Sequence, residues 1–268
     1  MKFILTSLLT LTSLATAADN QLTPAEKAGG WHLLFDGKTM NGWTDSAGKP
    51  MTSDAWAIED GSLKPRSKPT FTEDLFSKDK FTDFELVWDW KISSGGNSGL
   101  KYKIQDHIYM AGDRQKGKPR KFEEVVDDFS KNRIKARPAG KGQDYVVGFE
   151  YQMTDNATNH DALSKTTHSA GALYDMVAPA KDATKPVGEW NHSRLIVKGT
   201  HVEHWLNGEK VVDASIAADV VRPLLSTRWG QTPIVLDMLS EQPHKACPIS
   251  LQNHDDEAWF RNIKLRKF

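Results

Sequence analysis

The sequence predicts an all-β fold, a sandwich or jelly roll formed by one domain. Short runs rich in β-branched and aromatic residues alternate with Gly, Asn, Asp and Pro, a pattern typical of many short strands joined by turns. No long stretch has the apolar spacing of an amphipathic helix. The chain has 268 residues, a length that one all-β domain can reach, and no repeat or linker divides it.

The expected elements follow one another along the chain. A short helical turn is predicted at Leu22–Ala28, because Thr23 is a favoured N-cap residue and Pro24 fits a first turn. The Asn207-Gly208 pair predicts a two-residue hairpin turn. Strands are expected at Trp31–Phe35, Trp56–Glu59, Phe84–Ile92, Gly99–Gln105, Val146–Thr154, Ala172–Asp175, Ser193–Lys198, His201–Leu206, Lys210–Val212, Ile249–Gln252 and Trp259–Arg266.

Two long segments interrupt the strands. Asp113–Asp144 is dense in Lys and Arg and contains one short helix candidate, Phe122–Phe129. Ala217–Pro248 is punctuated by Pro and is expected to be irregular. Loops of this length in a compact domain are usually functional or mobile, although simple decoration of the scaffold is an equal alternative.

The N-terminus has the features of a secretory signal peptide. Lys2 supplies a basic start, Phe3–Leu14 forms an apolar stretch, and Ala15-Thr16-Ala17 matches a small-x-small cleavage site. We therefore predict a signal peptide at 1–17, an N-terminal segment at 18–28 and one domain at 29–268. A buried N-terminal helix is the alternative interpretation.

The rest of the composition limits the compartment and the partners. Cys247 is the only cysteine, so no internal disulfide can form, and the predicted location is secreted or periplasmic. No stretch is long enough to predict a membrane span. Lys and Arg number 35, equal to Asp and Glu, which gives no electrostatic reason to expect a nucleic acid as partner. The nine Trp residues serve either a core or sugar-stacking platforms.

Strict alternation in two strands predicts a core face and a polar face. Around residue 150, Glu150 and Gln152 share the polar face, and around residue 102 the same holds for Lys101, Lys103 and Gln105. The residues expected on the core side are Phe149, Tyr151, Met153, Leu100, Tyr102 and Ile104. On a concave sheet this polar mixture would suit a polyhydroxylated ligand; an ordinary solvated face is the alternative.

Polar clusters also follow the strands. Asp155, His160, Asp161 and His168 come after the Glu150 strand, and Asn253-His254-Asp255-Asp256 follows a late strand. Histidine with carboxylates can hold a divalent metal ion, but the spacing matches no closed metal signature, so a metal cofactor is left open.

Several enzyme classes lack their usual signals. The sequence has no Gly-rich phosphate loop, no Gly-x-Ser-x-Gly elbow and no HExxH. A retaining glycosidase needs two carboxylates flanking the bond, and Glu150 has no evident partner on its strand. These absences count against nucleotide-dependent, serine-esterase, zinc-protease and conventional glycosidase chemistry.

A series of short motifs occurs in a fixed order along the predicted domain. They are Gly30–Lys38 with Gly42-Trp43, Gly96–Gly99, Phe149–Gln152, Gly171–Asp175, Gly188–Asn191, His204–Gly208, Leu251–His254 and Phe260–Ile263. Together they resemble the 3-keto-disaccharide hydrolase family, also described as 3-keto-glucoside 1,2-lyase/3-keto-2-hydroxy-glucal hydratase. The family often has Asp at the position of Asn253 and Gly at that of Asp255. The resemblance implies a concanavalin A-like jelly-roll β-sandwich with a site on its concave face.

The resemblance also implies a substrate and a reaction. The carbonyl of a 3-keto-glycoside acidifies the hydrogen on C2, so a base can remove it, the C1 glycosidic oxygen can leave, and water can add to the resulting glycal. Expected catalytic residues are Glu150 as base or acid, His160 and His254 for proton transfer or metal ligation, and Lys101 for the enolate oxygen. Expected substrate-binding residues are Asn97, Gln152, Asp155, Tyr174, Trp190, Gln252 and Arg261.

Three other functions remain open at this stage. A non-catalytic carbohydrate-binding module would need the same fold and polar face but no base. A conventional glycoside hydrolase would act on an unoxidised sugar. A structural domain of the cell envelope is a third alternative, although no repeat or anchor in the sequence supports it.

Overall fold

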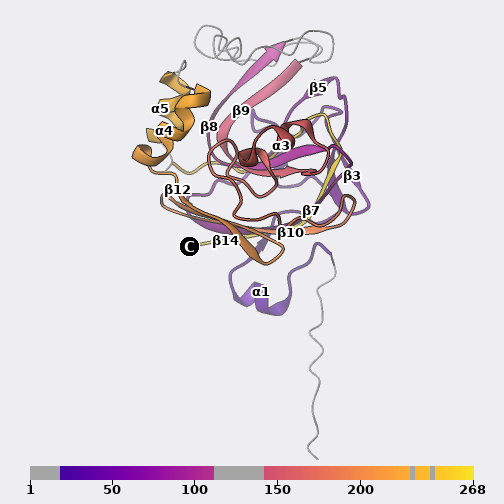
Figure 1. The fold of residues 1–268 in the computed structure, drawn as a ribbon. Helices are drawn as coiled ribbons and strands as arrows, with labels where there is room; N and C mark the ends of the chain where they lie inside the picture. Colours follow the sequence, from indigo (N-terminus) through magenta and orange to yellow (C-terminus); the bar gives the residue numbers. More distant parts are fainter. Residues whose placement is uncertain (1–18, 112–141, 230–232, 242–244) are drawn as a thin grey trace, which may run out of the picture.

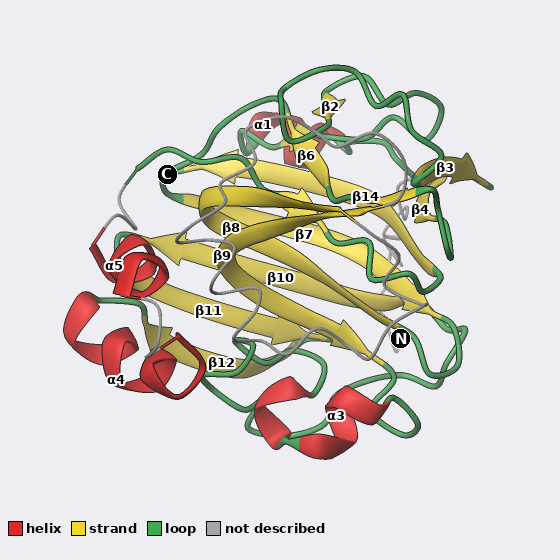
Figure 2. Ribbon diagram, turned by 90° about the horizontal axis from the view of Figure 1, so that it is seen from above, coloured by secondary structure: helices red, strands yellow, loops and turns green. Residues whose placement is uncertain are grey.

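The protein folds into two β-sheets packed face to face, seen in a computed structural model that describes residues 19–111, 142–229, 233–241 and 245–268 (Figures 1 and 2). Sheet A has the strand order β12 (Glu209–Ser215), β11 (His201–Leu206), β10 (Asn191–Lys198), β7 (Phe84–Ile92), β14 (Ala258–Lys267), β4 (Ser62–Pro65) and β3 (Trp56–Glu59), with β1 (His32–Leu33) also paired to β14. Sheet B has the order β2 (Trp43–Thr44), β6 (Leu75–Ser77), β13 (Ser250–Leu251), β8 (Asn97–Ala111), β9 (Gly142–Thr154) and β5 (Phe71–Thr72).

The core lies between the two sheets. Alternate residues of β7 are buried, and the Trp88 ring meets the Tyr151 ring of the other sheet edge-on, with centroids 4.9 Å apart. The Tyr151 hydroxyl lies 2.9 Å from Ser193 Oγ, which also accepts from Trp90 Nε1 at 2.8 Å. Tyr151 and Trp90 thus bury their rings with their polar atoms satisfied, as a stable sandwich core requires. The predicted all-β jelly-roll sandwich is therefore confirmed.

The long pair β8–β9 has the predicted alternation over its inner half. Phe149, Tyr151 and Met153 are fully buried in the core. The prediction is wrong beyond Tyr102, because the register shifts between Tyr102 and Asp106. Ile104 therefore joins a small separate cluster with Phe76, Val146 and Cys247. At the shift Lys103 takes a left-handed φ of 49° and donates to the Thr82 carbonyl, so it does not share the face of Lys101.

The segment predicted to be irregular, Ala217–Pro248, instead forms two helices, α4 (Ala218–Trp229) and α5 (Pro233–Glu241), beside the β8–β9 pair (Figure 1). Each helix buries apolar residues four positions apart: Val221 and Leu225 in α4, Val235 and Leu239 in α5. Pro223 inside α4 obscures this helical spacing in the sequence.

Other element predictions have mixed outcomes. β3, β7 and β11 have the predicted bounds, and α1 (Pro24–Ala28) has the expected Thr23 cap. Ala172–Asp175 is not a strand and contacts β9 only through an isolated bridge. The short strands β2, β4, β5 and β6 were not anticipated. The predicted signal peptide and the helix candidate at 122–129 lie outside the described residues. Every described helix is too short or too polar to cross a membrane.

The predicted hairpin turn joins β11 to β12. Asn207 and Gly208 have φ values of 50° and 87°, as a two-residue turn with a left-handed backbone requires. A Cβ placed on Gly208 would meet no atom within 4 Å, so any cost of a side chain there comes from the backbone conformation alone.

We expect Gly208→Ala to lower the free energy of unfolding by about 1 kcal/mol, because alanine is disfavoured in the left-handed region. Urea unfolding followed by circular dichroism measures this change. Gly208→Asn is the matched control and should cost less, because Asn tolerates this conformation better. An unchanged midpoint for the alanine variant would contradict the assigned turn.

Candidate active site

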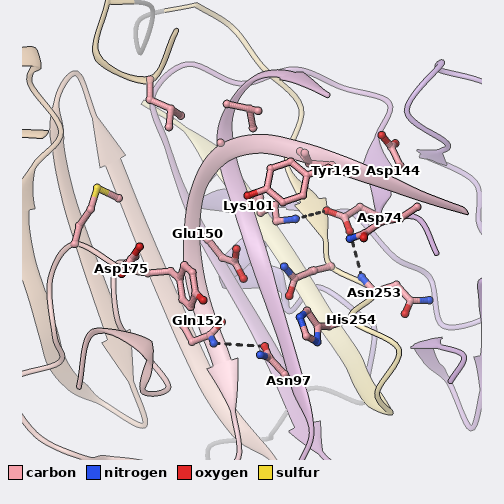
Figure 3. Close-up of a pocket in the computed structure, with 18 of the residues that line it drawn as sticks. Asp74, Asn97, Lys101, Asp144, Tyr145, Glu150, Gln152, Asp175, Asn253 and His254 are labelled. Carbon is pink, nitrogen blue, oxygen red and sulfur yellow. Dashed lines mark hydrogen bonds and ion pairs between the residues drawn. The ribbon is translucent and has the colours of Figure 1, made fainter. Parts of the chain in front are cut away.

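A pocket of about 170 Å³ opens on the face of sheet B that points away from the core (Figure 3). Strands β8 and β9 form its floor. Side chains of α4, α5 and the loop after β9 contribute its walls, including Leu225, Leu239 and Met176. The structure brings seven of the predicted site residues to this pocket: Glu150, His254, Lys101, Asn97, Gln152, Tyr174 and Gln252.

Lys101 and Glu150 stand side by side on the pocket floor. They are directly paired in the register of β8 with β9, and side chains of paired residues lie on the same face of a sheet. Burial alone would lower the pKa of Lys101, but the carboxylates of Asp74 and Glu150 outweigh burial and raise this pKa. Lys101 is therefore a cation at neutral pH.

Asp74 forms a buried ion pair with Lys101, in which Lys101 Nζ lies 2.9 Å from Asp74 Oδ2. The Ser250 hydroxyl and the Asn253 N–H also donate to Asp74, at 3.1 and 3.3 Å. Burial raises the pKa of Asp74, and the opposing effect of Lys101 offsets this only in part. With three donors converging on this carboxylate, we assign the pair as charged.

Glu150 owes its position to the absence of a side chain at Gly99. A Cβ at residue 99 would lie 2.3 Å from Glu150 Oε1, so the carboxylate rests against the backbone of β8. Gln152 flanks it. In the orientation drawn in Figure 3 the Gln152 amide nitrogen reaches Asn97 Oδ1 at 3.4 Å. Turned over, the nitrogen donates to the Ser98 carbonyl at 3.1 Å and to Glu150 Oε1 at 3.2 Å, which satisfies both ends of the amide better.

His254 lies at the pocket rim on a tightly bonded turn. Asn253 Nδ2 donates to the Ala55 carbonyl at 2.9 Å, and Asn253 Oδ1 accepts from the N–H of Asp255 at 2.9 Å. Asp255 has a left-handed φ of 68°, where the family often has Gly, and aspartate tolerates this conformation. His254 Nδ1 is 3.7 Å from Asp256 Oδ2, so a carboxylate lies near the ring.

His160 and Asp155 are not brought to the pocket. His160 is the exposed first residue of α3 (His160–Ser164), and its side chain is not part of the pocket lining. Asp155 is buried and accepts from the N–H groups of Gly95 and Ala157, which fixes the turn after β9. The structure thus gives Asp155 a position in a turn and His160 a position in solvent.

Trp190 and Arg261 lie on the outer face of the other sheet. Arg261 neighbours the buried Phe260 in β14, so alternation turns its side chain away from the core. Its guanidinium lies 3.9 Å from the centre of the Trp190 ring and pairs with Asp19 at 2.5 Å. Sequence spacing does not reveal which sheet a strand joins, and here that sheet is not the one under the pocket.

Sequence reasoning missed several residues that line the pocket, among them Asp74, Asp144, Tyr145 and Asp175. Asp74 lies between strands of only two and three residues, too short to recognise by alternation. Asp144 falls within the charged segment read as an insertion, and its Oδ1 lies 2.8 Å from His107 Nδ1. Asp175 was read as part of a strand.

A divalent metal ion gains no support from the pocket. Within the described ranges, three potential ligand atoms lie within 4.8 Å of one another only at His201, Glu203 and Asp213. This group is on the outer face of sheet A, where Lys210 already pairs with Glu203 and Asp213. We therefore assign no metal ligands in the pocket.

Three known proteins show the similarity of this chain to others. A curated 3-keto-disaccharide hydrolase of Bacteroides thetaiotaomicron is 32% identical over 269 residues, covering 95% of this chain and 84% of the relative. A crystal structure of a candidate glycosyl hydrolase from Parabacteroides distasonis is 27% identical, with a TM-score of 0.69, and covers 94% of this chain and all of that one. A second structure from that species is 24% identical, with a TM-score of 0.58, covers 89% of this chain and 99% of that one, and supports the fold.

The match to a family is equally extensive. Residues 30–266, nearly all of the predicted domain, match the 3-keto-alpha-glucoside-1,2-lyase-like domain. The family resemblance inferred from the motifs is confirmed, and the chain belongs to the 3-keto-alpha-glucoside-1,2-lyase-like family.

Proposed function

We propose that this protein cleaves 3-keto-glycosides by elimination across C1 and C2, followed by hydration of the product. Family membership supports the coarser statement, a carbohydrate-active enzyme of the 3-keto-disaccharide hydrolase type acting on a saccharide. The observation that carries the finer proposal is the pairing of Glu150 with Lys101 on the floor of one pocket. It supplies a base beside a fixed cation.

Glu150 is the candidate base. Its side chain is only partly buried and lines the pocket, so a substrate can reach it. The carbonyl at C3 makes the C2 hydrogen acidic enough for a carboxylate to remove. The electron pair of the C2–H bond then forms the enolate, whose charge rests on the C3 oxygen.

Lys101 is the candidate stabiliser of that oxygen. Because its pKa is raised, the side chain stays protonated and acts as a donor and a positive charge, not as a second base. Asp74 holds the ammonium in place before the substrate arrives. A charge fixed in advance where negative charge develops is the most effective form of electrostatic catalysis.

Collapse of the enolate completes the cleavage. Its electrons form the C1–C2 double bond, the C1–O bond breaks, and the leaving oxygen takes a proton from His254 or from protonated Glu150. Water can then add to C1 of the unsaturated ketone, with a proton returning to C2, so the net result is hydrolysis. One carboxylate suffices for this sequence, in contrast to the pair that a conventional glycosidase uses.

The remaining polar groups suit a sugar. We assign the amides of Asn97, Gln152 and Gln252 to the hydroxyls, because amides both donate and accept. The ring of Tyr174 offers an apolar surface to a sugar ring. These contacts alone would also describe a carbohydrate-binding module, so turnover decides between the two functions.

The first test replaces the base. Glu150→Gln should lower kcat on a 3-keto-glucoside by about 10²–10⁴-fold, the usual contribution of a general base, while the amide keeps the shape of the side chain. Release of the aglycone measures turnover, and circular dichroism checks the fold. Wild-type turnover of the unoxidised glucoside would instead favour a conventional hydrolase, and near-wild-type activity of the variant would remove Glu150 from the mechanism.

A second test moves the base without removing it. Gly99→Ala places a Cβ against the end of the Glu150 side chain, which is flexible and can swing away. We expect turnover to fall at least tenfold, because misplacement by about 1 Å can cost 100-fold, while the unfolding midpoint changes little. Gly29→Ala, at an exposed position with a φ of −80° after α1 and outside the pocket lining, is a control for the substitution itself. Full activity of Gly99→Ala would show that the carboxylate position is not critical.

We also propose that the protein is exported. The support is the order of Lys2, the apolar run and the small residues Ala15 and Ala17 in the segment 1–17. Expressed at full length in a Gram-negative host, the protein should appear in the periplasmic fraction with Ala18 as its first residue, as mass spectrometry can determine. Ala17→Arg should block the cleavage. An intact N-terminus on wild-type protein in the cytoplasm would refute export.

A further inference from the structure

Behind the pocket wall, His168 is held between two carboxylates. Its Nδ1 lies 2.8 Å from Asp161 Oδ1 and its Nε2 lies 3.0 Å from Asp175 Oδ1, with only 9% of the side chain exposed. An ionised carboxylate can only accept, so both ring nitrogens donate and the ring is an imidazolium. Burial lowers the pKa of His168, but the two carboxylates outweigh it and raise this pKa to about 9.

The same ring also fixes Tyr174. The two rings are stacked, with centroids 4.4 Å apart and an angle of 22° between their planes. The Tyr174 hydroxyl donates to the second oxygen of Asp161 at 2.9 Å. One buried cation therefore holds two consecutive residues, Tyr174 and Asp175, that both line the pocket.

The backbone of this wall is attached to the strand of the candidate base. The N–H of Tyr174 donates to the Glu150 carbonyl at 3.0 Å, and the N–H of Asp175 donates to the Thr167 carbonyl at 3.0 Å. Asp175 has a left-handed φ of 62°, a conformation that aspartate tolerates. His168 restrains this residue further, because it holds the Asp175 side chain.

Charge gives His168 a second effect. Asp161 and Asp175 share this ring, and Glu150 lies in the same pocket as Asp175. Without the imidazolium, Asp161 and Asp175 would repel each other, which would loosen this wall. Lys165 also pairs with Asp175, at 3.2 Å, but its side chain is 58% exposed, so solvent weakens that pair.

We propose that His168 is a positioning residue, whose buried side chain holds the Tyr174 ring and the Asp175 carboxylate where they bind the sugar. This inference rests on the proposed function, since it concerns substrate affinity at the same pocket. Glu150 is carried by β9, which pairs with β8 and β5 in sheet B, and this pairing does not involve His168. Loss of the His168 contacts should therefore weaken substrate binding more than it slows the chemical step.

Two variants separate the contacts of the ring. In His168→Gln the amide nitrogen takes the place of Nε2 and can still donate to Asp175, whereas in His168→Asn it takes the place of Nδ1 and can donate only to Asp161. We expect KM for a 3-keto-glucoside to rise about tenfold in His168→Asn, the scale for losing a hydrogen bond between charged groups, and less in His168→Gln. In both, kcat should stay within about threefold of wild type.

The matched control is Lys165→Ala, which removes the exposed partner of the same Asp175 oxygen and should leave KM within twofold. Thermal unfolding and circular dichroism identify any variant that fails to fold. In that case Tyr174→Phe serves as the second variant. It removes only the hydroxyl group that donates to Asp161, and we expect KM to rise. Unchanged KM in folded variants, or a loss of kcat alone, would overturn the positioning role. An inactive wild-type protein would instead refute the proposed function, so the two failures are distinct.

Discussion

The register between β8 and β9 sets both the core and the pocket, because neighbouring residues of a strand point to opposite faces. Tyr151 packs on Trp88 inside the sandwich, while Glu150, one residue earlier, stands beside Lys101 on the outside. A slip of one residue would exchange these faces, burying a carboxylate and exposing aromatic rings. The apolar core therefore fixes the register, and the register places the side chain of the candidate base in the pocket.

The buried charges of the pocket are unfavourable for stability, and they form two groups. Lys101 and Asp74 are both nearly inaccessible to solvent, and burying such a pair gains little stability over apolar packing. In the pocket wall, the His168 imidazolium offsets one of the two negative charges of Asp161 and Asp175. The Lys101 cation beside Glu150 suits the proposed reaction, in which negative charge moves from a base to a substrate oxygen.

The sequence allows prediction of this fold and of the pocket floor wherever a long strand has a regular period of two. The alternation around Glu150 and the Asn207-Gly208 turn are of this kind. What could not be predicted depends on distant contacts. Asp74 reaches Lys101 from the link between two short strands that have no readable period, and the outer face that holds Arg261 depends on the sheet that its strand joins. The helices α4 and α5 depend on packing against other elements, and Pro223 obscures the apolar spacing of α4 in the sequence.

The floor and the walls of the pocket have different physical origins, and this difference bears on function. Glu150 and Lys101 belong to paired strands whose positions the core fixes, so the chemistry they support is tied to the fold itself. Tyr174, Asp175 and the helix residue Leu225 come from connecting segments, which can change without disturbing the sheets. The contacts of the buried His168 with Asp161 and Asp175 hold part of such a connecting segment in place.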